Sequence, residues 1–439
     1  MSIQNSPAWI QSFRQRIPIL TYILLAYILK RTHGHLYVNE LIFLTIVFVF
    51  LLWFTRARSP ASHRDFNWVY LILSLLLLDS TELIYAENNQ AARVLEFLID
   101  AHIILPLIYC CYKPGAPSKD NFKDKLLWLS WGVIIISLIL VPLATPVPHI
   151  DVYHLLNQSA ENILQGINPY SFAYDGIYIG PPNLVYWPGL LYPALPFKLL
   201  GIDVRYAQIT SILVTAILFR YFNRNNEQHP HFFLLFMLMP IGLFVLEQSW
   251  YDAFLFPYIL LLFEGLKRQS VSLSALGLGY LAASRQWNLF VIIFVLVYLW
   301  RNYRTAFFFQ VCGYTALVSS VLFLPFWLWN FPAFLESTVI QVLSYPPRGD
   351  SLSWLSYVFA NHNQQLSPFP FMVATIAIGL VLTWRSRTPD RLFLVIFTSH
   401  LFFLLTSRQA FCNYYYYFSF YLFLFLAAQF PVRSLSSTA

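Results

Sequence analysis

Asp151 and His154 are the titratable residues whose types and spacing first suggest chemistry. They open and close the sequence Asp-Val-Tyr-His, and side chains three residues apart on a helix can face each other. Carboxylate and imidazole groups are the side chains that most often move protons in active sites. An aspartate at a helix start is also a common N-cap, and a histidine near a membrane surface can simply be solvated. Both interpretations stay open for each residue.

Other charged residues lie close to the ends of apolar stretches. Arg285 and Arg408 both stand between a serine and a glutamine. An ionisable residue at membrane depth is a candidate for function, although an arginine at a helix end can also extend its side chain to the interface. Three roles are open for Asp252: it binds hydroxyl groups, it helps to position Asp151, or its charge is stabilised by the dipole at the start of a helix. Arg348, in Pro-Pro-Arg-Gly-Asp, is most simply a solvated loop residue.

The elements that must position these residues are membrane helices. The chain is 58% hydrophobic and only 11% charged, whereas a soluble domain has about a quarter charged residues. Continuous apolar runs such as 71–78 exclude the alternating pattern of a membrane barrel. We therefore expect an all-α, polytopic membrane protein with about 13–15 transmembrane helices. The candidate spans are 17–31, 40–55, 67–86, 94–112, 126–146, 204–222, 232–248, 251–266, 271–287, 288–300, 306–328, 368–384, 390–407 and 412–429.

The basic residues indicate the orientation of these helices. The net charge of +7 does not predict nucleic-acid binding, because the 27 Lys and Arg residues are scattered among short loops. Basic residues favour cytoplasmic loops, which places both termini in the cytoplasm of a multi-pass protein of the cell (inner) membrane. This orientation requires that 181–200, rich in proline, is a re-entrant or interfacial stretch. Two long segments, 147–203 and 329–367, then lie outside, where long ordered loops are usually functional.

We divide the chain into three parts. They are the N-terminal transmembrane helices, a catalytic module that carries both long segments, and a cytoplasmic tail: 1–125, 126–429 and 430–439.

Residues 151–167 predict an amphipathic helix that lies in the membrane interface. The apolar side chains share one helical stripe, namely Val152, Leu155, Leu156, Ala160, Ile163, Leu164 and Ile167. The polar side chains share the other face, namely His154, Asn157, Gln158, Glu161, Asn162 and Gln165. Gly166 fits the helix end, and the following Asn-Pro-Tyr turns the chain away.

Several short motifs follow one another in a characteristic order. They are Asp151-x-Tyr153, Ala160, Leu164-x-Gly166-x-Asn168-Pro169-Tyr170, Tyr186-x-Pro188, Leu200-Gly201-x-Asp203-x-Arg205, Gln248-Ser-Trp-Tyr-Asp252-Ala253 and Gly349-Asp350-Ser351-Leu352-Ser353. In this order they resemble the GT-C superfamily of integral-membrane glycosyltransferases, closest to the polyprenol-phosphate-mannose-dependent mannosyltransferase type. The resemblance covers about residues 126–429. Two departures are that four candidate spans precede the one that leads to Asp151, and that arginine stands at 285 where relatives often have lysine.

The resemblance implies a reaction and roles for these residues. A sugar, a hexose such as mannose, would pass from a polyprenyl-phosphate donor to an extracytoplasmic hydroxyl of a lipid or glycan acceptor, with inversion. Asp151 would act as general base, a role that contributes about 10²–10⁴-fold. Cations would stabilise the leaving phosphate. The residues expected to bind substrate or donor phosphate are His154, Arg285, Arg408, Asp252, Tyr170, Tyr186 and Arg348. No cofactor is expected; some relatives use a divalent metal, but no tight ligand cluster is evident.

Two other functions compete with this hypothesis. A transporter or flippase of lipid-linked sugars would carry ionisable residues inside the membrane, and Asp79 and Glu82 with Glu96 and Asp100 are its best support. The third hypothesis is a noncatalytic scaffold. Besides substrates, the expected partners are membrane lipids, with no nucleic acid. The sugar, the acceptor, the linkage and the oligomeric state are not encoded in these patterns.

Overall fold

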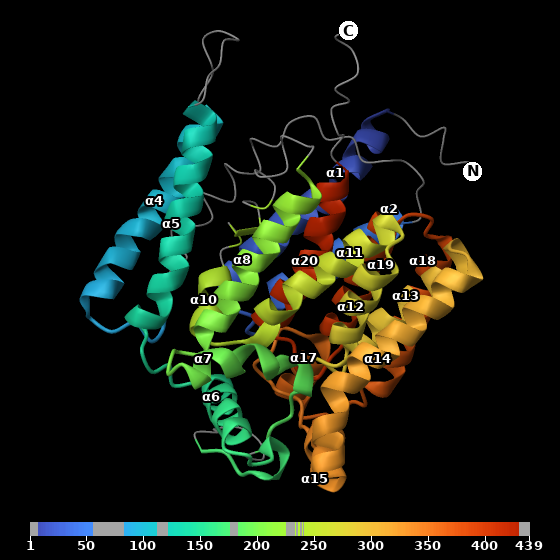
Figure 1. Cartoon of the computed structure of the whole chain (residues 1–439). Helices are drawn as coiled ribbons and strands as arrows, with labels where there is room; N and C mark the ends of the chain where they lie inside the picture. The colour runs from blue at the N-terminus through green and yellow to red at the C-terminus, as the bar shows by residue number, and fades with distance from the viewer. Residues whose placement is uncertain are drawn as a thin grey trace.

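The fold is helical throughout the residues that the computed structural model describes, which are 8–55, 83–111, 122–175, 183–224, 233, 236–237, 239 and 241–429. In that part of the chain extended pairing is limited to one bridge between His35 and Ser351. The helices, shown in Figure 1, are α1 (Ala8–Thr32), α2 (Val38–Thr55), α4 (Gln90–Cys111), α5 (Phe122–Ala144), α6 (Asp151–Leu164), α7 (Leu195–Leu199), α8 (Arg205–Phe222), α10 (Gly242–Glu247), α11 (Phe256–Arg268), α12 (Val271–Ala282), α13 (Asn288–Asn302), α14 (Thr305–Trp329), α15 (Phe331–Leu335), α16 (Gln341–Ser344), α17 (Trp354–His362), α18 (Phe369–Arg385), α19 (Pro389–Leu405) and α20 (Cys412–Ala428). Short 3-10 helical turns are η2 (Pro169–Ser171), η3 (Pro188–Leu190), η4 (Tyr192–Ala194) and η5 (Tyr251–Leu255). The turn η6 (Glu336–Ile340) is π-helical.

The all-α class expected from the sequence is confirmed for the described residues. Most candidate spans coincide with a helix to within a few residues. The candidate at 251–266 divides into η5 and α11, and Pro257 stands in the first turn of α11, where a missing N–H costs nothing. The candidate at 67–86, most of 232–248 and the tail 430–439 lie outside the described residues.

The centre of the bundle is α20, which is buried along nearly its whole length. It packs against α1, α11 and α19, while α2 packs on α19 (Figure 1). The main cluster of buried apolar side chains draws members from α1 and α2 as well as from the helices beyond residue 126. The N-terminal helices therefore share one core with the rest of the bundle.

In the described part of the chain two helices, α2 and α14, are long and apolar enough to cross a membrane, judged by length and composition alone. The 25 residues of α14 would span about 37 Å. Leu317, Val321 and Leu328 on α14 are exposed. Side chains of this kind in water would form a large apolar patch.

The two long segments of the sequence meet at one end of the bundle. Figure 1 shows α6, α7, α15 and α17 at its lower end, whereas α1 begins and α20 ends at the upper end. Asn330 Nδ2 donates to Ser171 Oγ at 2.9 Å, which joins the segments directly. The described part of 181–200 forms only η3, η4 and α7, of which the longest has five residues, far short of the length of about 20 that a span needs.

Candidate functional site

The start of α6 fixes the position of Asp151. Ile150 is the N-cap residue, with an extended backbone and no capping side chain. Asp151 is therefore not the N-cap, contrary to one interpretation of the sequence, but the first helical residue. Its Oδ1 accepts the N–H of Val152 at 2.8 Å, and a negative charge there is favoured by the helix dipole. The other oxygen has no hydrogen bond among the described residues.

The end of α6 follows the sequence prediction. Gly166 has φ +74°, a conformation that glycine adopts without strain. Its N–H donates to Ile163 O at 3.1 Å and the N–H of Ile167 donates to Asn162 O at 2.8 Å, which is the Schellman pattern.

The predicted faces of α6 are correct near Asp151 and wrong near Gly166. Val152, Leu156 and Ala160 are buried as expected. Asn162, assigned to the polar face, is buried too, whereas Leu164 and Ile167 are exposed. The last turn departs from the pattern because the chain reverses direction at Gly166. Tyr170 and Tyr174 then pack back against α6 and cover part of its predicted polar face.

Asp151 lies half-buried among hydroxyls and cations. Its charge is within electrostatic reach of the hydroxyls of four tyrosines, Tyr186, Tyr251, Tyr345 and Tyr414. Burial raises the pKa of the Asp151 carboxyl above its ordinary value, and the N–H of Val152, Arg348 and His154 offset this only partly. A carboxylate with a raised pKa holds a proton more strongly, as a general base should.

Arg348 is more than the solvated loop residue that the sequence suggested. Its guanidinium pairs with Asp350 through contacts of 2.8 Å from Nε and 2.6 Å from Nη2, and it lies 4.9 Å from the centre of the Phe411 ring. Its backbone N–H donates to Arg408 O at 3.0 Å. Hydrogen bonding to Arg348 lowers the pKa of the Asp350 carboxyl. The loop thus holds a fixed cation beside Asp151.

The turn between α1 and α2 supports this loop. Leu36 N–H donates to Asp350 O at 2.9 Å, and Leu352 N–H donates to Gly34 O at 3.0 Å. Gly34 has φ +81°, and a Cβ there would lie 2.2 Å from the backbone nitrogen of Cys412. Only glycine fits this approach, so the N-terminal helices help to shape the site.

Asp252 and Arg285 form a buried ion pair. The Oδ1 of Asp252 lies 3.0 Å from Nη2 of Arg285, with side chains 0% and 3% exposed. Asn413 Nδ2 donates to the other carboxylate oxygen at 3.0 Å. The Arg285 guanidinium lies over the rings of Trp287, Tyr414 and Tyr186, at 5.0, 5.6 and 5.8 Å. The two charges thus form an ion pair, but Arg285 Nε and Asp252 Oδ1 are buried without a hydrogen bond among the described residues.

Gly189 holds the η3 turn against this pair. Its N–H donates to Ala283 O at 2.8 Å, and Tyr280 Oη donates to Gly189 O. A Cβ at Gly189 would lie 2.5 Å from Ser284 Oγ. The proline-rich stretch is therefore pressed onto the end of α12, next to Arg285.

Arg408 is the cation of the predicted set that has no carboxylate partner among the described residues. Its Nη1 donates to the carbonyls of Tyr345 at 3.2 Å and Leu343 at 3.4 Å. Its Nε is buried without a hydrogen bond in the described structure. A guanidinium that is only partly satisfied keeps donors for an anion.

The two predicted tyrosines have different surroundings. Tyr170 is buried and its hydroxyl donates to Tyr186 O at 2.8 Å, so it holds the loop in place. The ring of Tyr186 lies against that of Tyr251, with centroids 4.2 Å apart, and remains partly exposed. His154 is also partly exposed and contacts the Tyr153 ring.

Sequence reasoning gave no role to Asn413, Tyr345 or Arg205. In the sequence the one signal for Asn413 is its position as a single amide directly before the aromatic run of α20. Tyr345 precedes the Pro-Pro-Arg sequence and reaches Asp151 only because the loop folds back.

Arg205, noted only within a motif, is fully buried. It pairs with Asp203 at 2.7 Å, and its Nη1 donates to Thr145 Oγ1 at 2.8 Å. Its guanidinium also lies 5.1 Å from the Tyr153 ring centre. This cluster ties the ends of α5 and α8 to the start of α6.

Among the described residues, no group of three or more His, Cys, Asp or Glu side chains is placed to hold a metal ion. Comparisons with protein-family models, with curated proteins and with solved structures gave no match.

Proposed function

We propose that this chain is a multi-pass membrane glycosyltransferase of GT-C type. It moves a sugar, a hexose such as mannose, from a polyprenyl-phosphate donor to a hydroxyl on an extracytoplasmic lipid or glycan acceptor. The acceptor oxygen bonds to the anomeric carbon from the side opposite the phosphate, the bond from that carbon to the phosphate oxygen breaks, and the acceptor proton passes to Asp151. The sugar is transferred with inversion, and polyprenyl phosphate leaves.

The observation that carries this proposal is the setting of Asp151. It is a half-buried carboxylate with one oxygen anchored to Val152 N–H and the other without a bond among the described residues. Burial raises the pKa of Asp151. An anchored carboxylate with a free oxygen is suited to accept a proton from a positioned hydroxyl.

The groups around Asp151 suit the other reactants. Arg348 acts on the charge of Asp151, and Arg408 donates to the carbonyl of Tyr345 and keeps an unused donor at Nε. Both supply positive charge for a leaving phosphate. The ring of Tyr186, together with Tyr345 and Tyr414, offers flat faces with hydroxyl edges, which suit a sugar. His154 lies one helical turn from Asp151 and is open to either reactant.

Membrane placement is supported by the outer surface of the bundle. α2 and α14 pass the length and composition test for a span, and large apolar side chains are exposed on α4, α5, α8, α14 and α18 as well. We propose that these helices cross the cell (inner) membrane with both termini in the cytoplasm. Asp151 then faces the extracytoplasmic side, where a lipid-linked donor can enter laterally from the bilayer.

The direct test uses purified full-length chain with a panel of polyprenyl-phosphate sugars and a lipid acceptor. We expect release of polyprenyl phosphate from one donor, and its loss in Asp151→Asn. Glu161→Gln is the matched control, since it also changes a carboxylate to an amide on α6 but at an exposed position. Wild-type turnover by Asp151→Asn would remove the assignment.

A transporter finds less support in the described residues. Glu96 and Asp100 on α4 are exposed rather than buried in the bundle, and Asp79 and Glu82 lie outside the described residues. The same preparation in proteoliposomes separates the two functions, because transport moves a labelled lipid-linked sugar across the bilayer with its phosphate bond intact. A noncatalytic scaffold would tolerate alanine at Asp151.

A further inference from the structure

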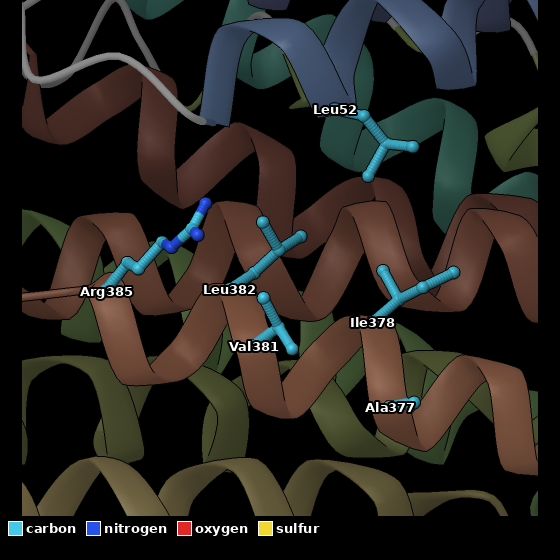
Figure 2. A pocket seen from close by; sticks show the side chains of 6 residues that line it. All are labelled: Leu52, Ala377, Ile378, Val381, Leu382 and Arg385. Carbon is cyan, nitrogen blue, oxygen red and sulfur yellow. The ribbon is translucent and has the colours of Figure 1, made fainter.

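A groove lies between α2 and α18, at the opposite end of the bundle from Asp151. Both helices pack on α19, and the groove between them has a volume of about 490 Å³. Figure 2 shows Leu52 of α2 facing the side chains of Ile378 and Leu382 across this space, with Arg385 at one end. Ala377 and Val381 complete the lining.

The lining is apolar along its length and positive at one end. The five residues from α18 recur with the spacing of a single helical face, and from Ala377 to Arg385 they extend about 12 Å. Arg385 is exposed and has neither an ion-pair nor a hydrogen-bond partner among the described residues. The shape and composition match an acyl chain that ends in a charged group.

The charges around Arg385 are mainly positive. Arg387 is close enough to Arg301 to act on its charge, and Arg391 lies over the ring of Phe54, near Leu52 on α2. The nearby carboxylate, Asp390, already accepts a hydrogen bond from Gln429 at 2.9 Å. An anionic group would therefore be attracted to this end of the groove, and a zwitterionic one much less.

We propose that this groove binds an anionic phospholipid, with one acyl chain along α18 and the phosphate on Arg385. The proposal uses the membrane placement argued above but not the transfer reaction. The lipid is distinct from the sugar donor, because α18 has 17 residues and places Arg385 about 25 Å from the end near Asp151. Its role is to anchor α2 to α18 where they make little direct contact.

The test measures lipid retention by native mass spectrometry on the full chain, with phosphatidylglycerol and phosphatidylcholine as probes. We expect phosphatidylglycerol to be retained over phosphatidylcholine, and Arg385→Gln to weaken its binding about fivefold, as for one cation near an anionic lipid. Ala377→Trp should fill the groove and release both lipids. Arg387→Gln is the control and should weaken binding less than Arg385→Gln, because it removes a cation from the same end but does not line the groove.

Equal retention of the two lipids would overturn the proposal, as would equal losses in Arg385→Gln and Arg387→Gln. If Ala377→Trp instead converts a dimer to a monomer without changing lipid retention, the groove binds a second copy of the chain and the proposal is wrong. Arg385→Lys should restore most of the retention. None of these readouts depends on sugar transfer, so the result stands apart from the proposed reaction.

Discussion

The site contains two aspartates near arginines, and their settings differ. Asp252 is fully buried, in an ion pair with Arg285 at 3.0 Å and hydrogen-bonded to Asn413. Asp151 is half-buried, with Arg348 near enough to act on its charge but bonded to Asp350 instead. A carboxylate in direct contact with a guanidinium is committed to it, whereas one in the field of a more distant cation can still take a proton. On this difference we propose a structural role for Asp252 and the proton-accepting role for Asp151.

Asp151→Asn should give the largest effect. We expect turnover to fall about 10²–10⁴-fold, the usual contribution of a general base, while the unfolding temperature in detergent stays close to that of the wild type. Steady-state transfer and a thermal unfolding scan on one preparation check both. A large loss of stability instead would show that Asp151, like Asp252, mainly stabilises the fold.

Arg285→Leu should lower the free energy of unfolding. Removing the guanidinium leaves the Asp252 charge buried and unpaired, which costs about 3–5 kcal/mol. Denaturation in detergent measures the loss.

The double variant Arg285→Leu with Asp252→Leu is the control, and should recover most of the stability because no lone charge remains. If it is stable and also binds donor poorly, Arg285 contacts phosphate after all and the comparison fails.

Arg348→Gln should change the pH dependence. The unprotonated form of Asp151 is the base, so activity rises as pH passes through its pKa. Because Arg348 lowers the pKa of Asp151, its removal should raise that pKa and move the acidic limb of the kcat/KM profile to higher pH. Arg387→Gln should leave the limb in place, and a shift to lower pH in Arg348→Gln would contradict the geometry.

Glu161→Gln should have the smallest effect. Glu161 pairs with Lys198 at 3.0 Å, but its side chain is 47% exposed, and exposed pairs contribute about 0–1 kcal/mol. We expect unchanged turnover and a stability change within that range, both read from the assays above. A loss of transfer as large as that of Asp151→Asn would show that α6 as a whole is fragile, not that Asp151 is a base.

The sequence by itself determined the helices and the local ends of α6. Continuous apolar runs favour helices wherever the backbone must satisfy its own hydrogen bonds, so most predicted bounds agree with the structure. Gly166 predicted the end of α6 because a left-handed residue there is a local requirement. The proline-rich character of 181–200 predicted its lack of a long helix for the same kind of reason. The catalytic and substrate-binding roles assigned to all the candidate site residues stay predictions.

Only the tertiary structure decided which charges are free. Asp252 and Arg285 are 33 positions apart in the printed sequence, and nothing in the spacing shows that they pair with each other. Arg348 and Asp350 are only two positions apart, but the turn between α1 and α2 fixes their loop, because Leu36 N–H donates to Asp350 O and Leu352 N–H donates to Gly34 O. Charge pairing depends on distances of a few ångströms between distant segments, because the interaction energy falls with separation and rises with burial. Local patterns in a sequence carry no such distances.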